Sequence, residues 1–425
     1  MASYGIRDPV YGFVRFSELE KHVIAQPAFQ RLRRIHQLGF SYLVYPGACH
    51  TRFEHSVGVM HLASLMFEAI TARDENKILL KAELNYDDHS LARDKDLIRL
   101  AGLLHDVGHA PFSHVSEAIM PLNPSTNEGF KHEDYSESII MGSLKSAIEN
   151  TDKNKLGIKA EEVVAFLKGN VEILGRRVFW RVLLSSQLDA DRADYLLRDS
   201  LHVGVKHGLY DCERLLDTLT LANFPEEDHQ LILCVEKGGW HVAEALVICR
   251  YLMFTQVYFH KTTRAYQRHL ERALATLLPD GKLPKPTQKA TYLRTDDYST
   301  WRDIIAHAKR NPDCRAIVCR NHYREVYCTA EKASNAEKDI LEALKKKLLE
   351  NQVDFFEDTS ERLWYELNTA TKPSQEIFVF DGKKSPKPLS ELSSLAPVIG
   401  EINQTRLYVP ENDRRKAEEI KKCTI

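Results

Sequence analysis

Ala101-Gly-Leu-Leu-His-Asp-Val-Gly-His-Ala-Pro-Phe-Ser-His114 is the stretch of sequence that decides the fold. The helix that leads into it is apolar nearly all round, which is typical of a buried helix, at Leu97, Ile98, Leu100, Ala101, Leu103 and Leu104. The helix ends in His105 and Asp106, so ionisable groups stand where the core should be driest. We therefore expect a mainly α-helical fold with a polar site at this helix end.

Three further clusters are suited to join that site: Arg52-Phe53-Glu54-His55, His109 to His114, and Asp189-Ala190-Asp191-Arg192. Adjacent helical residues point about 100° apart, so His105 and Asp106 can both lean onto one ion. An upstream histidine and a downstream aspartate complete a set of two imidazoles and two carboxylates. Such a set neutralises a divalent cation and, in a six-coordinate site, leaves room for water and a phosphate oxygen. Hydrolysis of a phosphorylated substrate suits this arrangement.

The downstream aspartate is chosen by periodicity. After residue 188, polar residues recur every four positions and share one helical face, namely Asp191, Tyr195 and Asp199. This spacing favours Asp191 as the fourth ligand, and Asp189 is interpreted as the helix N-cap or as a carboxylate behind the ligands. The alternative is an ordinary solvent-exposed stripe with an Asp194–Arg198 pair at i,i+4.

The size of the chain indicates more than one structural unit. Its 425 residues exceed the usual length of one domain, and the amino-acid composition becomes typical of a linker at Asp280-Gly-Lys-Leu-Pro-Lys-Pro286. We expect a helical core over 1–280 and a smaller α+β region over 281–425, packed on the core and contributing to oligomerisation. A small hairpin is predicted before a first helix near Ser17.

Other elements follow from hydrophobic periodicity. Helices are predicted over 133–149, 160–168, 176–186, 190–200, 211–221 and 240–277. After the linker, residues 315–329 and 376–381 alternate like strands, and 331–350 is an amphipathic helix.

Bulk properties exclude several functional classes. The formal net charge of −2 provides no general attraction for nucleic acid or an anionic membrane. We find no apolar run of membrane-spanning length and no signal core, so a cytoplasmic location is expected, or a nuclear one in a eukaryote. The eight cysteines form no Cys-x-x-Cys pair and are interpreted as reduced thiols.

Four segments, residues 29–39, 45–58, 101–114 and 188–199, closely resemble the HD-domain phosphohydrolases. Within that family they are most similar to the deoxynucleoside triphosphate (dNTP) triphosphohydrolase branch, over about residues 5–275. The resemblance implies an HD-domain helical core and a reaction that releases inorganic triphosphate and a deoxynucleoside. It also implies a homo-oligomer, dimer or tetramer, and one metal ion held by His55, His105, Asp106 and Asp191.

The same resemblance assigns catalytic roles. It makes His114 the general acid and His109 a phosphate-positioning residue, with His132 and Glu133 as further active-site residues and Glu117 orienting His114. From the residues alone, the alternative for His109 and His114 is a pair of loop histidines satisfied by backbone groups.

Triphosphate carries about four negative charges, so the pocket needs cations beyond the metal. The resemblance assigns Arg52 to phosphate, and Arg192 stands where some relatives have lysine. Tyr195 is expected to bind phosphate, and Asp199 the 3′-hydroxyl of the sugar.

Further substrate contacts are expected at both ends of the resembling region. Gln37 and Leu38 correspond to residues that lie against the deoxyribose, which would exclude a 2′-hydroxyl by sterics. Lys261, Arg264 and Tyr266 are candidates to close the site over phosphates and base. Core packing explains their aromatic neighbours equally well.

Several alternatives stay open. Ala25-Gln26-Pro27 replaces the Asp-Thr-Pro found in relatives that respond to an activating nucleotide, so such activation is not carried over. A mixed His/Asp set accommodates manganese, iron, magnesium or zinc. The same metal site could act on another nucleotide, a monophosphate or a nucleic-acid end. A nucleotide-sensing or nucleic-acid-binding scaffold is a third class, which the near-neutral charge disfavours.

Overall fold

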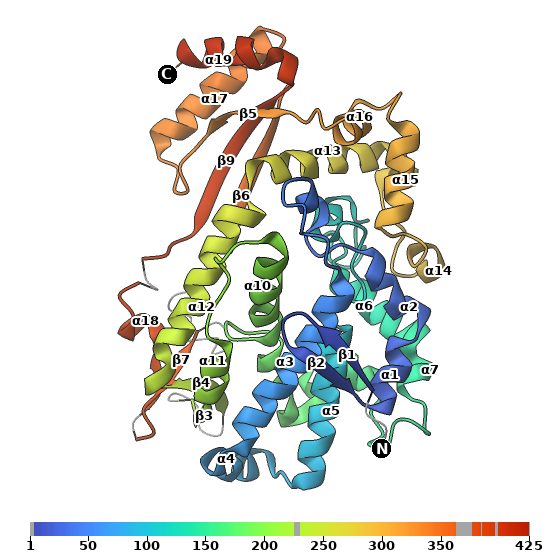
Figure 1. Ribbon diagram of the computed structural model, residues 1–425, viewed down its shortest axis with the longest axis vertical. Coiled ribbons are helices and arrows are strands. Elements are labelled where there is room, and N and C mark those ends of the chain that lie inside the picture. Colours follow the sequence, from blue (N-terminus) through green and yellow to red (C-terminus); the bar gives the residue numbers. More distant parts are fainter. Residues whose placement is uncertain (1–3, 225–229, 363–375, 384, 396–397, 425) are drawn as a thin grey trace.

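The computed structural model describes residues 4–224, 230–362, 376–383, 385–395 and 398–424. Within them the chain is mainly helical, with a hairpin near the N-terminus and a mixed α/β region at the C-terminal end (Figure 1). The centre is helix α5 (Asp88–Leu104), which packs against α3 (Arg52–Ala72), and α3 also packs against α10 (Ala190–Val203). The mainly helical fold predicted from the sequence is confirmed.

The N-terminal hairpin is also confirmed. Strand β1 (Tyr4–Asp8) pairs antiparallel with β2 (Gly12–Phe16), and α1 follows at once (Glu18–Ile24). Ser17 begins α1 with a capping box, because its side chain accepts from the Glu20 amide while Glu20 accepts from the Ser17 amide.

Shorter helices surround this centre: α2 (Pro27–Gln30), α4 (Asp74–Leu84), α6 (His132–Ile139), α7 (Lys145–Ile148), α8 (Ala160–Lys168), α9 (Val171–Leu174) and α11 (Cys212–Thr218). The helix predicted over 133–149 is interrupted by a π-helical turn at Ile140–Leu144. The one predicted over 176–186 is a 3-10 helix, Gly175–Leu183.

The single helix predicted over 240–277 is wrong. Helix α12 (Trp240–Met253) runs into a π-helical turn, Phe254–Tyr258, and a new helix, α13 (Lys261–Leu277), leaves at 64°. The stretch has neither proline nor glycine at the break, so helical periodicity did not reveal it. His260 begins α13 by accepting from the Thr262 amide.

The strand predicted over 315–329 is correct in its second half. Residues Pro312–Val318 form helix α16, because the Asn311 side chain accepts from the Cys314 amide and proline occupies the first helical turn. Strand β5 follows at Arg324–Cys328. Helices α14 (Lys289–Tyr292) and α15 (Asp297–His307) precede α16.

The C-terminal region contains a three-stranded antiparallel sheet of order β5-β9-β6, with β6 at Phe356–Arg362 and β9 at Ile402–Val409. Helix α17 (Asn335–Glu350) is the amphipathic helix predicted over 331–350, and it packs with α19 (Arg414–Lys422). Their apolar side chains share a small cluster that includes Leu344, Leu348 and Leu407. Figure 1 places this unit beyond α13, at the end of the molecule away from α4.

The structure contains a second sheet, of which the sequence predicted only one strand. It joins β3 (Leu219–Asn223), β4 (Leu231–Glu236), β7 (Phe378–Phe380) and β8 (Lys387–Pro388), and α18 (Leu389–Leu392) follows. Strands β3 and β4 are buried along almost their whole length, so they lack the polar alternation that would have identified them.

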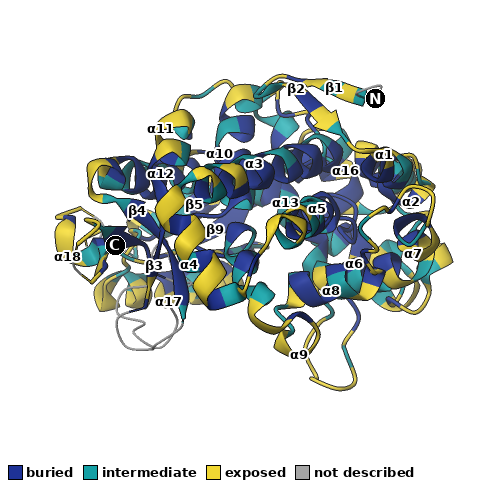
Figure 2. Cartoon of the chain, turned by 90° about the horizontal axis from the view of Figure 1, so that it is seen from below, coloured by how far each residue is buried: buried dark blue, intermediate teal, exposed yellow. Residues whose placement is uncertain are grey.

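The main core extends across the helical part of the chain. Figure 2 shows α3 and α5 largely buried inside it. Leu283, Tyr292, Ile304 and Ile317 belong to the same apolar cluster as the α3 and α5 residues, so α14 to α16 pack on the helical centre.

The sequence predicts reduced cysteine thiols and no membrane-spanning segment. All eight cysteines are free. Within the described residues no single helix has both the length and the apolar composition to cross a bilayer, although the bent pair Lys237–Tyr258 and Lys261–Leu277 reaches them jointly.

Candidate active site

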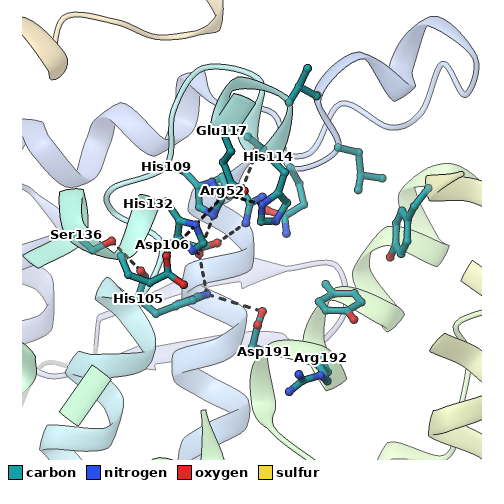
Figure 3. Close-up of a pocket in the computed structure, with 18 of the residues that line it drawn as sticks. Arg52, His105, Asp106, His109, His114, Glu117, His132, Ser136, Asp191 and Arg192 are labelled. Atoms are coloured by element: carbon teal, nitrogen blue, oxygen red, sulfur yellow. Dashed lines mark hydrogen bonds and ion pairs between the residues drawn. The ribbon is translucent and has the colours of Figure 1, made fainter. Parts of the chain in front are cut away.

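Three elements bring the expected metal ligands together, and Figure 3 labels His105, Asp106 and Asp191 among them. His55 lies on α3, Asp191 on the first turn of α10, and His105 directly after α5. Asp191 Oδ1 lies 3.0 Å from His55 Nε2 and 3.9 Å from His105 Nε2. One ligand atom from each of the three residues lies within 4.8 Å of the others, a spacing suited to one cation. These three residues and Asp106 are called the inner cluster below.

Asp106 completes this group from the side. Its Oδ2 lies 3.6 Å from His55 Nε2 and accepts a 2.5 Å hydrogen bond from Arg52 Nη1. Its Oδ1 lies 3.3 Å from His105 Nε2 and 3.2 Å from His109 Nε2. Burial raises the pKa of Asp106, but its neighbours His105 and Arg52 outweigh burial and hold the pKa well below the usual value. The carboxylate is therefore ionised.

The chemistry of His105 fits a metal ligand. Its Nδ1 donates to the Gly102 carbonyl at 2.8 Å, which leaves the lone pair on Nε2. That Nε2 is buried and makes no hydrogen bond within the described part of the chain. A buried imidazole lone pair beside two carboxylates is the environment that a divalent metal ion requires.

His55 is held from behind. Its Nδ1 donates to Asp194 Oδ2 at 2.8 Å. Burial lowers the pKa of His55, but hydrogen bonds with Asp191 and Asp194 outweigh burial and raise it to about 10, so the site favours positive charge here. The Asp194–Arg198 pair exists at 2.9 Å, yet both side chains are 0% exposed, so the solvent-stripe alternative is wrong.

A second group lies next to the inner cluster and is called the outer cluster: His109, His114, Glu117 and His132. Glu117 Oε1 accepts from His114 Nδ1 at 2.9 Å and from His132 Nδ1 at 3.0 Å. The His132 ring stacks on that of His109, with centroids 4.0 Å apart.

The electrostatics of the outer cluster differ between its members. Burial raises the pKa of Glu117, but hydrogen bonds from His114 and His132 outweigh it and lower the pKa. Burial and then the Arg52 charge lower the pKa of His109, which is therefore neutral. The Glu133 carboxylate lies 3.3 Å from His132 Nδ1 and is itself largely exposed.

A strained turn separates His109 from His114. Phe112 and Ser113 have φ of 57° and 59°, a conformation that costs free energy in residues other than glycine. The Phe112 amide donates to Asp297 Oδ1 on α15 at 2.6 Å. Ser113 Oγ accepts from Arg52 Nε at 2.9 Å and donates to the His36 carbonyl at 2.8 Å. Helix α15 thus stabilises the turn that presents both histidines.

All residues of the two clusters except His55 line one cavity of about 660 Å³. Seven of the nine expected substrate-binding residues also line it: Gln37, Leu38, Arg52, Arg192, Tyr195, Asp199 and Arg264. Lys261 and Tyr266 are not part of the lining that the described residues provide. The Lys261 side chain is mostly exposed, 3.8 Å from Glu325, and Tyr266 is fully buried with its ring against His322.

Two of the expected cations are already paired. The Arg192 guanidinium contacts the Asp189 carboxylate and the Ser186 carbonyl. Asp189 is also the N-cap of α10, accepting from the Arg192 amide at 2.8 Å, as predicted. Arg264 forms a two-point ion pair with Asp358 on β6, at 2.8 and 2.6 Å.

Asp199 is held in a buried network. Its Oδ1 accepts from His50 Nε2 at 2.7 Å, and its Oδ2 accepts from the Tyr258 hydroxyl at 2.6 Å. Asp199 therefore presents an oriented carboxylate at the cavity wall.

Sequence reasoning missed several residues of the site. Lys168, Arg181 and Gln267 line the cavity from α8, the 3-10 helix and α13, and no motif marks them. Asp194 could have been found, because it follows Asp191 by one helical turn.

Comparison with known proteins agrees with this geometry. Residues 52–199 match the model of the HD domain, and residues 210–359 match that of an HD associated region. The first range contains every inner-cluster and outer-cluster residue.

Three similar proteins illustrate the range of relatives. The uncharacterized protein YwfO of Bacillus subtilis is 29% identical, over 96% of this chain and 92% of its own. The deoxynucleoside triphosphate triphosphohydrolase SAMHD1 of Homo sapiens is 30% identical over 69% of this chain, which spans 45% of the human protein. A solved phosphohydrolase from Bacteroides thetaiotaomicron is 25% identical with a TM-score of 0.73, covering 96% of this chain and 100% of that one.

Proposed function

We propose that this chain, which belongs to the HD-domain phosphohydrolases with an HD-associated region, hydrolyses dNTPs to a deoxynucleoside and inorganic triphosphate. The observation that carries the proposal is the position of Asp106, which belongs to the inner cluster and whose Oδ1 also lies 3.2 Å from Nε2 of His109 in the outer cluster. The similarity to the human enzyme is what points to dNTPs.

The reaction divides into steps that this site can serve. Water loses one proton as its oxygen bonds to the α-phosphorus, the bond from that phosphorus to the 5′ oxygen breaks, and the 5′ oxygen takes up one proton, so protons balance. A bound divalent ion supplies polarisation of a phosphate oxygen and a lowered pKa for water. Asp106, ionised and held by Arg52, keeps negative charge at the ion-binding face.

His114 is suited to deliver the proton. Its side chain is 65% exposed, so it can reach a ligand in the cavity. Glu117 accepts from its Nδ1 and stabilises the imidazolium form, which leaves the Nε2 proton to be given to the 5′ oxygen.

Arg52 and His109 are suited to hold the phosphates near the break. Arg52 is fixed at two points, by Asp106 and Ser113, so its guanidinium loses little freedom on binding. His109 is buried, its Nε2 lies 3.2 Å from Asp106 Oδ1, and its Nδ1 makes no hydrogen bond within the described residues. A phosphate oxygen or bound water would satisfy it.

A product assay tests the proposal. The purified protein is incubated with each dNTP and Mn²⁺, and the phosphate product is separated and identified. Tripolyphosphate together with deoxynucleoside supports the proposal, and orthophosphate contradicts it. Ribonucleoside triphosphates serve as the matched substrates, because the wall of Gln37 and Leu38 should exclude a 2′-hydroxyl.

One observation favours a second candidate, hydrolysis of a phosphate monoester such as a nucleoside monophosphate. Arg192 and Arg264 are both engaged by carboxylates, so fewer free cations face a long triphosphate tail. Orthophosphate release from nucleoside monophosphates, with no tripolyphosphate from dNTPs, would favour this candidate.

A further inference from the structure

A continuous chain of buried charged groups runs from the inner cluster to the N-terminal hairpin. His55 Nδ1 donates to Asp194 at 2.8 Å, and Arg198 binds Asp194 at two points, each 2.9 Å. Arg198 Nη1 then donates to Asp8 Oδ2 at 2.9 Å. None of the three charged residues behind His55 is more than 4% exposed.

The far end of this chain is fixed by backbone geometry. Asp8 Oδ1 accepts from the amides of Val10 and Tyr11 at 2.8 and 3.0 Å, so one carboxylate closes the hairpin turn and binds Arg198. The hairpin is thereby connected to α10, which is 190 residues away along the chain.

Helix α3 makes room for the chain at Gly58. A Cβ atom at this position would lie 2.0 Å from Asp194 Oδ1 and 2.3 Å from Arg198 Nη2. Glycine therefore permits the ion pair of α10 to pack directly against the helix that carries His55. Glycine has a lower helix propensity than alanine because it lacks the Cβ methyl group. Its presence in α3 allows α3 and the ion pair of α10 to approach closely.

Stability alone does not explain this arrangement. Burying several charges is expensive, and apolar side chains of similar volume are often as stable or more stable. A carboxylate has an effect on an imidazole that an apolar side chain cannot have. By accepting a hydrogen bond from Nδ1, it fixes the tautomer and the orientation of the ring. His55 Nε2 is then directed toward the inner cluster, where Asp191 Oδ1 lies 3.0 Å away.

We propose that Asp194, Arg198 and Asp8 are positioning residues that orient His55 for metal binding, so that the N-terminal hairpin sets the metal affinity of the inner cluster. The inference rests on the metal centre of the proposed function but not on its substrate. Metal content can therefore be measured whichever phosphate ester is hydrolysed.

The test compares Asp194→Asn and Asp8→Asn with a matched control, Glu20→Gln. Glu20 is equally buried and joins α1 to α5 through Arg99, at 2.5 and 2.9 Å, but it does not contact His55. All three substitutions remove one buried carboxylate charge. Binding of Mn²⁺ to the metal-free full chain and the midpoint of thermal unfolding are measured for each.

We expect the variants to differ in Mn²⁺ affinity, and the control to differ from the unaltered protein in thermal stability alone. Asp194→Asn should weaken Mn²⁺ binding by about 10- to 100-fold, the usual effect of losing such a carboxylate. Asp8→Asn should weaken binding less but in the same direction, and the double variant should bind no more weakly than Asp194→Asn alone, because the residues act in series. Glu20→Gln should lower the unfolding midpoint and leave Mn²⁺ affinity unchanged.

The proposal is overturned if Asp194→Asn or Asp8→Asn binds Mn²⁺ as tightly as the control does. Should Asp194→Asn fail to fold, Asp8→Asn decides the question, since Arg198 keeps its ion pair with Asp194 there. Normal Mn²⁺ binding by the unaltered protein without tripolyphosphate release would contradict the dNTP proposal and leave this one standing.

Discussion

The inner and outer clusters meet where Asp106 contacts His109, but they are built in different ways. The inner cluster has its ligands on or directly beside the long helices α3, α5 and α10, and His55 is backed by fully buried charges. The outer cluster stands on a 3-10 helix, Ser113–Ile119, on the strained turn before it and on the first residue of α6. Its His114 is mostly exposed.

Under the proposed function the inner cluster holds the ion and the outer cluster moves a proton, and the difference in construction fits these two roles. A metal site needs ligands fixed by surrounding structure, and packed helices with buried hydrogen bonds supply that. A general acid must instead approach the reacting atom, so an exposed imidazole with one nitrogen held by a carboxylate is suitable. Four variants, ordered by expected effect, test this division.

The largest effect is expected from the double variant His105→Ala, Asp106→Ala. It removes half of the inner cluster, so metal binding and hydrolysis should fall to background while the protein stays folded. Elemental analysis, the product assay and circular dichroism measure the three properties. His241→Ala, which removes an exposed histidine, is the control. A double variant that retained a full equivalent of metal would refute the assignment of the inner cluster.

His114→Asn should separate the clusters most clearly. We expect the metal content to stay unchanged and kcat to fall by about 10²- to 10⁴-fold, the usual contribution of a general acid. Hydrolysis at the unaltered rate would show that His114 is not the proton donor.

A smaller loss is expected for Glu117→Gln. The amide can no longer stabilise an imidazolium at His114 or His132, and one charge-assisted hydrogen bond contributes about 1.4 kcal/mol, or roughly tenfold in kcat. Steady-state kinetics at fixed Mn²⁺ give the value. A loss as large as that of His114→Asn would mean that Glu117 touches the substrate itself.

The smallest effect is expected from Lys261→Ala. Its side chain lies outside the cavity lining and is mostly exposed, so KM should change by less than about twofold, equivalent to about 0.5 kcal/mol. Initial rates over a range of substrate concentrations measure KM. A tenfold rise would indicate that α13 brings Lys261 into the site when substrate binds.

Local patterns predicted much of the fold. The buried helix ending at His105, the start of α10 at Asp189 and the hairpin before Ser17 were all predicted from periodicity and capping residues. Strands β3 and β4 escaped prediction because they are buried on both faces, and the α12–α13 break escaped because no residue type marks it.

The sequence by itself determined the His105-Asp106 pair at the end of a buried helix and the polar face of residues 191–199, and therefore which side chains are candidates for the inner cluster. It did not determine the environment of Asp194 and Arg198, whose spacing is that of a common surface pair. Tertiary structure decided that α3 and the hairpin cover this pair, that Asp297 supports the turn before His114, and that Lys261 stays outside the cavity. The physical reason is range: helix periodicity is set by neighbours within one turn, whereas burial and ion pairing depend on segments that meet only in the folded chain.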